Sequence, residues 1–170
     1  MKKLIAAFAL FVGISANASV ISIQVSDTNV SVGETVSVSL LATGFEDFDT
    51  FDFDFDFDTS VFNYDASSLI SDLSFGLAFE VNQVADGMAL SFFDFFPVNG
   101  DFLLASFDLL AVGEGSSSFT FSDTLFSDTF LQTELEVDTS DSDAVDVSTP
   151  ATLGLFGMAA LALFGFRRKA

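Results

Sequence analysis

The most regular pattern in the chain is the alternation of phenylalanine and aspartate over residues 51–58, which reads FDFDFDFD. Successive side chains of a β-strand point to opposite faces, so a strand here would have four rings on one face and four carboxylates on the other. A helix would scatter both sets around its axis. We predict a strand with an aromatic core face, and the acids then form a solvated face, a metal site or a catalytic row.

Period-two patterns also dominate the rest of residues 19–137. They predict strands over 21–25, 35–40, 76–84, 88–93, 102–112 and 118–121, with 130–137 closing a sheet. The turn signals Asp86-Gly87 and Gly113-Glu114-Gly115 separate some of these strands. The one helical pattern is short and covers Ala66–Leu73. Strands at such regular spacing predict an all-β fold, an antiparallel two-sheet sandwich.

Phenylalanine supplies most of the apolar volume of this sandwich. The chain has 24 Phe, one Tyr and no Trp, which predicts a large aromatic core. Two adjacent pairs, Phe92-Phe93 and Phe95-Phe96, break the alternation. We expect one member of each pair to face outward, into a loop or toward a partner.

Charge is distributed very unevenly along the chain. All five basic residues are terminal, namely Lys2, Lys3, Arg167, Arg168 and Lys169, whereas 25 acidic residues lie between them. Nucleic acid is excluded as a partner, because binding to phosphate depends on Lys and Arg. A body with this charge repels itself unless salt or calcium screens it.

The same composition excludes most catalytic sites. Residues 19–149 contain no His, Cys, Lys or Arg, so a Ser-His-Asp relay, a Cys-His relay and a His-ligated zinc or iron site cannot form there. A hydrolase that uses two carboxylates is the remaining enzymatic interpretation, but such sites usually place Trp, Arg or His around the acids. We therefore expect a protein that is not an enzyme.

Calcium is the ion that these acids would favour, because hard cations bind carboxylate oxygens. The candidate ligands are Asp52, Asp54, Asp56 and Asp58. Acids two residues apart on a strand are separated by roughly 6.6–6.8 Å, so a specific site would need oxygens from a neighbouring strand or loop. No EF-hand loop is present. We expect diffuse association of cations with this face more than a preformed site, and calcium is the one cofactor that the sequence suggests.

The first 18 residues have the three parts of a secretory signal peptide. A basic start is followed by the apolar stretch Leu4–Ile14, which is too short to span a bilayer, and by the small-x-small site Ala16-Asn17-Ala18. We predict cleavage between Ala18 and Ser19, and hence export of the protein.

The other end combines an apolar run, residues 151–166, with the basic cluster Arg167-Arg168-Lys169. Sixteen helical residues span about 24 Å, slightly less than the ~30 Å hydrocarbon core of a bilayer. The basic cluster would keep this terminus in the cytoplasm. We predict a short transmembrane helix that anchors the protein transiently in the inner membrane; an ordinary tail anchor or a buried helix is the alternative. Residues 138–149 are acidic and rich in Ser and Thr, which predicts a flexible spacer.

This tail resembles the PEP-CTERM sorting signal of Gram-negative bacteria, in which a short Pro-containing motif precedes a transmembrane segment and a basic cluster. The motif here is Thr149-Pro150-Ala151, without the Glu and second Pro of the family. The resemblance implies recognition by a membrane enzyme of the exosortase type and an association with exopolysaccharide. The variant motif leaves removal of the tail open.

The body of the chain resembles the cohesin domain. Three stretches carry the resemblance in order: VSVGETVSVSLLA at 30–42, FDFDFDFDTSVFNYD at 51–65, and GDFLLASFDLLAVGEGSSSFTFSD at 100–123. The resemblance implies a jelly-roll sandwich of about nine strands that binds a ligand and does not catalyse a reaction. It does not by itself imply a dockerin partner.

We therefore expect an exported, non-enzymatic protein of the cell surface or extracellular matrix of a Gram-negative bacterium, with polysaccharide or a matrix protein as its partner. Two alternatives stay open. One is a cohesin-type receptor for a specific protein, and the other is a calcium-dependent carbohydrate-binding module.

Overall fold

The computed structural model describes residues 19–74, 76–142 and 144–149. Within these ranges the chain forms eleven β-strands and no helix, which confirms the predicted all-β fold. The strands are β1 (Ser19–Val25), β2 (Asn29–Ser31), β3 (Thr35–Asp56), β4 (Phe62–Ile70), β5 (Ala78–Val84), β6 (Gly87–Ala111), β7 (Gly115–Ser117), β8 (Thr120–Asp128), β9 (Thr133–Leu135), β10 (Val137–Ser140) and β11 (Val145–Ser148).

Strands β3 and β6 form a long antiparallel ribbon. At one end Thr35 pairs with Leu110, and at the other end Asp56 pairs with Gly87. The register shifts several times between residues 40 and 50 of β3. Such bulges bend a strand and increase its twist, so they divide the eight-stranded sheet into two halves.

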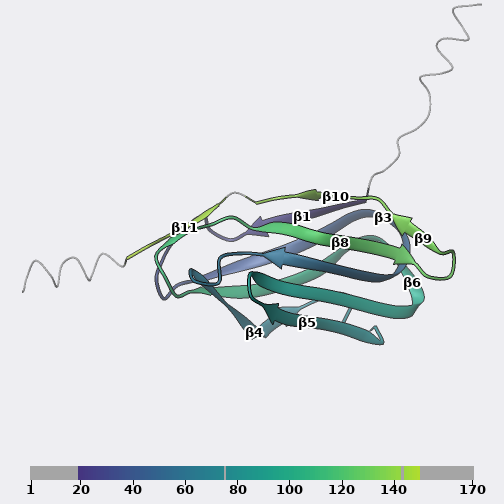
Figure 1. Ribbon diagram of the computed structural model, residues 1–170, viewed down its shortest axis with the longest axis horizontal. Coiled ribbons are helices and arrows are strands. Elements are labelled where there is room, and N and C mark those ends of the chain that lie inside the picture. The colour runs from purple at the N-terminus through teal and green to yellow at the C-terminus, as the bar shows by residue number, and fades with distance from the viewer. Residues whose placement is uncertain (1–18, 75, 143, 150–170) are drawn as a thin grey trace, which may run out of the picture.

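Each half has its own neighbours around this ribbon. In the first half, residues 35–43 of β3 lie in the order β10-β1-β3-β6-β4. In the second half, residues 50–56 of β3 lie between β6 and β8, with β5 and β9 outside them. A separate three-stranded sheet has the order β2-β11-β7. Figure 1 shows the resulting elongated domain, with β9 near one end and β11 near the other.

Aromatic side chains pack between the inner faces of the two halves of the sheet. The ring centroid of Phe55, in the second half, lies 5.4 Å from that of Phe107 in the first half. Near the bend, Phe45 and Phe48 each lie 5.7 Å from Phe102. These contacts confirm the two-layer sandwich and its aromatic core.

The bulges decide which side of β3 faces this core. In the first half the buried positions are even-numbered, from Val36 to Ala42, whereas in the second half they are the odd-numbered Phe51, Phe53 and Phe55. A strand without extra residues would keep one parity along its length. The register shifts between the halves therefore turn the phenylalanines of FDFDFDFD inward and the aspartates outward.

Two expectations about single elements are wrong. Ala66–Leu73 does not form a helix, because most of it belongs to β4, which pairs with β6 on either side of an irregularity, at Asp65 with Asp108 and at Ile70 with Ser106. The strands expected over 88–93 and 102–112 form the single strand β6. The described residues form eleven strands where the resemblance implied about nine, since short strands form the additional small sheet.

The spacer expected over residues 138–149 contains two strands of the domain. Strand β10 pairs in parallel with β1, and β11 pairs with both β2 and β7. Val145 and Val147 are buried in the core, with 0% and 5% of their surfaces exposed. The expectation of a flexible spacer is therefore wrong for these strands, and the sandwich continues to Ser148.

Candidate binding surface

The acids of the alternating segment lie on the outer face of the second half. Phe51, Phe53 and Phe55 are at most 2% exposed. Asp52 is exposed, and Asp54 and Asp56 are partly exposed, on the opposite side of the same strand. The prediction of an aromatic core face and an acidic outer face is confirmed for β3.

Small side chains flank this row of acids on β6. On the outer side of β6, Gly87, Ala89 and Ser91 lie beside the acids, while Met88 and Leu90 face the core. Gly87 has a φ of 153°, and a Cβ at this position would collide with the carbonyl oxygen of Phe55. The outward side chains of β6 are therefore short, and they leave the neighbouring carboxylates accessible from this side.

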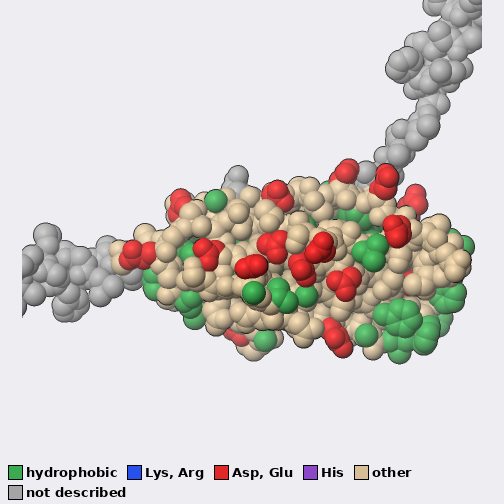
Figure 2. Space-filling model, in the orientation of Figure 1, with side chains coloured by type: hydrophobic (Ala, Val, Ile, Leu, Met, Phe, Trp, Pro, Cys, Tyr) green, Lys and Arg blue, Asp and Glu red, His purple; other side chains and the backbone are tan. Residues whose placement is uncertain are grey.

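Strand β8 adds a fourth acid to the row. Asp123 has a φ of 49° and lies where the register between β3 and β8 shifts, between the pairs made by Asp52 and Asp54. The Ser122 hydroxyl donates a hydrogen bond to Oδ2 of Asp56 at 2.6 Å. We call the outer surface formed by Asp52, Asp54, Asp56 and Asp123 the acidic face; Figure 2 shows acidic side chains gathered along the middle of the domain.

The four carboxylates of the acidic face repel one another. Burial, followed by the charges of Asp56, Asp123 and Asp52, raises the pKa of Asp54 above its ordinary value. No Lys, Arg or His occurs in residues 19–149 to offset these charges. The face would therefore favour a ligand that brings positive charge.

Asp58 does not belong to this face. Its Oδ1 accepts hydrogen bonds from the backbone N–H and the hydroxyl of Ser60, at 2.8 and 2.6 Å. These bonds lower the pKa of Asp58 and hold the turn that follows β3. Of the four candidate calcium ligands, the structure thus places Asp52, Asp54 and Asp56 on one face and assigns Asp58 to a turn. Among the described residues, no three acids converge as a set that could hold a metal ion.

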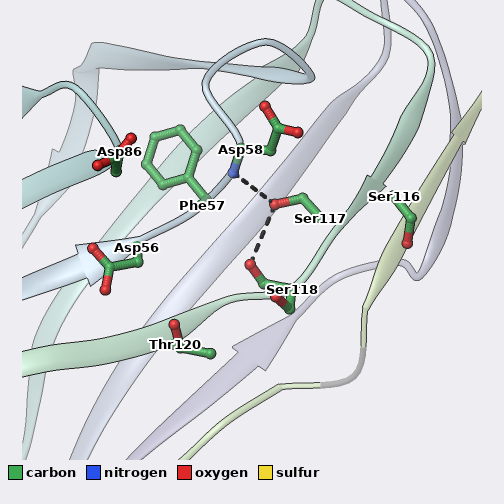
Figure 3. Close-up of a pocket in the computed structure, with 8 residues that line it drawn as sticks. All are labelled: Asp56, Phe57, Asp58, Asp86, Ser116, Ser117, Ser118 and Thr120. Atoms are coloured by element: carbon green, nitrogen blue, oxygen red, sulfur yellow. Dashed lines mark hydrogen bonds between the residues drawn. The ribbon is translucent and has the colours of Figure 1, made fainter.

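An open hollow of about 350 Å³ lies beyond the end of the acid row (Figure 3). Its lining comes from three parts of the chain: Asp56, Phe57, Asp58, Asp86, Ser116, Ser117, Ser118 and Thr120. The Asp58 N–H donates to the Ser117 hydroxyl at 2.9 Å, and this hydroxyl donates to the carbonyl oxygen of Ser118 at 3.2 Å. In Figure 3 the acids Asp56 and Asp86 lie to one side of Phe57 and the serines to the other.

The sequence pattern pointed to only two residues of this hollow, Asp56 and Asp58. Asp86 comes from the hairpin before β6, and Ser116–Ser118 come from β7 and the turn after it. These segments are far from Asp56 in the sequence, and only the pairing of β3 with β6 and β8 brings them together. Hydroxyl and carboxylate oxygens line the hollow, so it is suited to ligands rich in hydrogen-bond donors.

A second hollow, of about 280 Å³, lies on the first half, and its lining includes Tyr64, Asp65 and Asp108. The Ser37 hydroxyl donates to Oδ1 of Asp108 at 2.6 Å. Burial, and then the charge of Asp65, raise the pKa of Tyr64. Neither hollow contains a nucleophile paired with a base of the kind that catalysis by Ser or Cys requires.

Most residues of the two terminal signals lie outside the described ranges. This applies to Ala16 and Ala18 of the cleavage site, and to Pro150, Ala151, Arg167, Arg168 and Lys169 of the sorting motif. Ser19 begins β1, and Thr149 follows β11. None of the described elements is a helix with the length and apolar character that would cross a membrane, and the expected span over 151–166 is not among them.

Several solved structures with the same architecture are cohesins. A non-cellulosomal cohesin from the archaeon Archaeoglobus fulgidus superimposes with a TM-score of 0.64 at 11% identity, over 78% of this chain and 92% of that one. The sixth cohesin of scaffoldin B from Acetivibrio cellulolyticus, solved in complex with a Cel5 dockerin, gives 0.62 at 19% identity, over 77% and 99%. A cohesin module of a family 33 glycoside hydrolase from Clostridium perfringens gives 0.59 at 14% identity, over 78% and 100%.

No protein-family model and no curated protein matches the sequence. The structural matches cover most of this chain and nearly all of each cohesin. At these identities they establish the cohesin fold of the domain, which confirms the fold implied by the resemblance.

Proposed function

We propose that this cohesin-fold domain is a non-enzymatic protein-binding module, and that the acidic face is its binding surface. The observation that carries the proposal is the row of Asp52, Asp54, Asp56 and Asp123 beside the small side chains of β6, on a sheet face where all four acids are exposed or partly exposed. The bound dockerin in the Acetivibrio cellulolyticus structure supports protein binding as a use of this fold.

The chemistry of the face specifies the kind of protein that fits it. The raised pKa of Asp54 reflects burial and repulsion from the neighbouring carboxylates, both of which act against its charged form. Lys or Arg side chains from a partner would relieve this repulsion and form charge-assisted hydrogen bonds with the carboxylates. The small outer side chains of β6 leave room for long basic side chains to lie across the strand.

The sequence supports export and surface display as the setting. We infer that the predicted signal peptide is removed after Ala18, and that the tail with Pro150 and the basic cluster at 167–169 retains the protein transiently in the inner membrane. Recognition by an exosortase-type enzyme would then deliver the domain to the cell surface or the extracellular matrix of a Gram-negative bacterium.

Matrix polysaccharide is the second candidate ligand, and the hollow in Figure 3 favours it. Its serine, threonine and carboxylate oxygens accept hydrogen bonds from sugar hydroxyls, and the hollow is open to solvent. Calcium bound between the acids and a sugar would strengthen such an interaction.

The two candidates are separated by affinity capture with the full chain as bait and the extracellular fraction of the producing organism as the source. Three baits are compared: wild type, the acidic-face variant D52N/D54N/D56N, and a control with the same change in charge elsewhere, E114Q/E136Q/D146N. The proposal predicts saturable capture of one protein by wild type and by the control, and loss of that protein with the acidic-face variant.

Equal loss with both variants would show that capture depends on total charge, and equal capture by all three baits would exclude the acidic face. Recovery of polysaccharide instead of protein, after protease treatment of the same fraction, would favour the second candidate.

A further inference from the structure

Five large apolar side chains are exposed together at one end of the sandwich. They come from the segment before β5, the bend of β6 and the turn between β8 and β9, and their exposed fractions are Leu77 61%, Phe95 60%, Phe96 78%, Phe130 66% and Leu131 71%. We call this surface the apolar end. Figure 2 shows apolar side chains clustered at one end of the domain.

The strand register brings these segments to the same end. Phe93 of β6 pairs with Thr50 of β3 and with Ala78 of β5, and Thr50 also pairs with Ser127 of β8. Leu77 precedes Ala78, whereas the other four apolar residues follow Phe93 and Ser127. The three segments therefore leave the second half of the sheet side by side.

Buried carboxylates fix the backbone that carries four of these apolar side chains. Oδ1 of Asp94 accepts hydrogen bonds from the N–H groups of Phe95 and Phe96, at 2.6 and 3.3 Å. Oδ1 of Asp128 accepts from the N–H groups of Phe130 and Leu131, both at 2.9 Å.

A third carboxylate fixes the turn between β8 and β9. Asp49, which is 0% exposed, accepts hydrogen bonds from the N–H and the hydroxyl of Thr129, at 3.0 and 2.5 Å. The rings of Phe93 and Phe95 also meet edge to face, with centroids 5.3 Å apart. These contacts constrain the backbone of both segments, which would lower the conformational entropy that binding costs there.

The size of the apolar end fits a protein interface. Each of its five side chains is at least 60% exposed, and exposed apolar surface gathered in one place marks an interaction site. A standard protein interface buries about 800 Å² on each partner. The expectation that one member of Phe95-Phe96 faces outward is exceeded, because both rings do.

The acidic residues around the apolar end determine which kind of partner fits it. The segments around the apolar end carry only acids among their charged residues, and the exposed ones are Glu46, Asp47, Glu80, Asp101 and Glu134. A second copy would bring two identical acidic rims together, since a two-fold interface matches each patch with itself. A partner whose apolar side chains are flanked by Lys or Arg would complement both the centre and the rim.

We propose that the apolar end is a second docking surface, for a protein segment with apolar side chains flanked by basic ones. This surface is separate from the acidic face, so its failure would leave the proposed function standing.

The test uses the full chain and two synthetic peptides of equal charge, an amphipathic leucine–lysine peptide and its analogue with serine in place of leucine. Fluorescence anisotropy measures their affinities for wild type, for F95S/F96S, and for V112S, which changes an exposed apolar residue at the opposite end. Thermal unfolding checks that each variant is folded.

Wild type and V112S should bind the leucine peptide at least about tenfold more tightly than the serine peptide, and F95S/F96S should lose that difference. Added salt should weaken binding of the leucine peptide. Equal affinity of wild type for both peptides would overturn the proposal, and so would an unchanged preference in F95S/F96S.

Two further measurements identify other occupants. Sedimentation of the full chain tests for a second copy, and flotation with phosphatidylcholine vesicles tests for a membrane. Self-association or vesicle binding that F95S/F96S abolishes, without a preference for the leucine peptide, would also overturn the proposal.

Discussion

Asp54 illustrates how the acid row acts on a single side chain. It lies on the central strand of the second half, and burial and three neighbouring carboxylates raise its pKa. A carboxyl whose pKa is higher in the folded than in the unfolded state stabilises the fold when it is protonated. That contribution is present below the unfolded pKa and is lost as the pH rises through the folded pKa, so ionised Asp54 destabilises the domain at neutral pH.

The substitution Asp54→Asn should therefore raise the melting temperature at pH 7, by the equivalent of roughly 0.5 kcal/mol for a partly exposed charge. The gain should vanish near pH 3, where the carboxyl is protonated in both states. Calorimetric melting over this pH range tests the prediction, with Glu114→Gln in the exposed turn after β6 as the control for net charge. A gain of equal size for Glu114→Gln would contradict a local effect of the acid row.

Residues 51–58 show what a short pattern can predict. Alternation alone gave the strand and both of its faces, because side chains of period two must separate onto two sides of a sheet. The pattern could not give the bulges between Leu40 and Thr50 that reverse the buried parity along β3, because Gly44 and the acids around it offer no regular signal. It also could not give the hollow beside Asp56, whose serines come from a distant strand.

Among whole elements, β4 and β11 were the hardest to predict. The sequence around Ala66 favours a helix locally, but the pairs that Asp65 and Ile70 make with β6 hold the stretch between them within β4, so tertiary contacts override local preference. Residues 138–149 have the composition of a flexible spacer, yet Val145 and Val147 alternate with polar residues and are buried. The acidic, Ser- and Thr-rich composition favoured a spacer, although the alternation of Val145 and Val147 with polar residues is typical of a strand.

Strand β11 should therefore contribute to the stability of the domain. Val145→Ala should lower the free energy of unfolding by about 2 kcal/mol, because it removes buried methyl groups at a fully packed position. Asp146→Ala, on the exposed side of the same strand, should change it by less than about 0.5 kcal/mol. Urea denaturation of both variants measures the difference, and equal effects would indicate that this segment lies outside the cooperative fold.

For the molecule as a whole, the unbalanced charge opposes folding. The 25 acids between the termini have no basic residue to pair with, and aromatic burial offsets their repulsion. Raising NaCl from 10 mM to 500 mM should therefore raise the melting temperature, by about 3–6 °C if screening supplies 1–2 kcal/mol. Calcium at equal ionic strength should raise it at least as much. A melting temperature that does not change with either salt would show that the acids are not mutually destabilising.

The terminal charges should act on location and not on folding. Replacing Arg167, Arg168 and Lys169 with neutral residues should impair retention in the membrane or sorting, because the charge that stops transfer is lost. Fractionation of cells that produce this variant tests the prediction, with Lys2 and Lys3 left unchanged so that entry into the export pathway is preserved. Normal surface display of the variant would contradict the sorting interpretation of the tail.

The claim that the acidic face binds a basic protein surface is tested most directly by calorimetric titration of the captured partner into wild type, D52N/D54N/D56N and E114Q/E136Q/D146N. We predict one-to-one binding by wild type and by the charge-matched control, an affinity that falls with added salt, and at least about tenfold weaker binding by the acidic-face variant. Equal affinity of the acidic-face variant and wild type for that partner would contradict the claim.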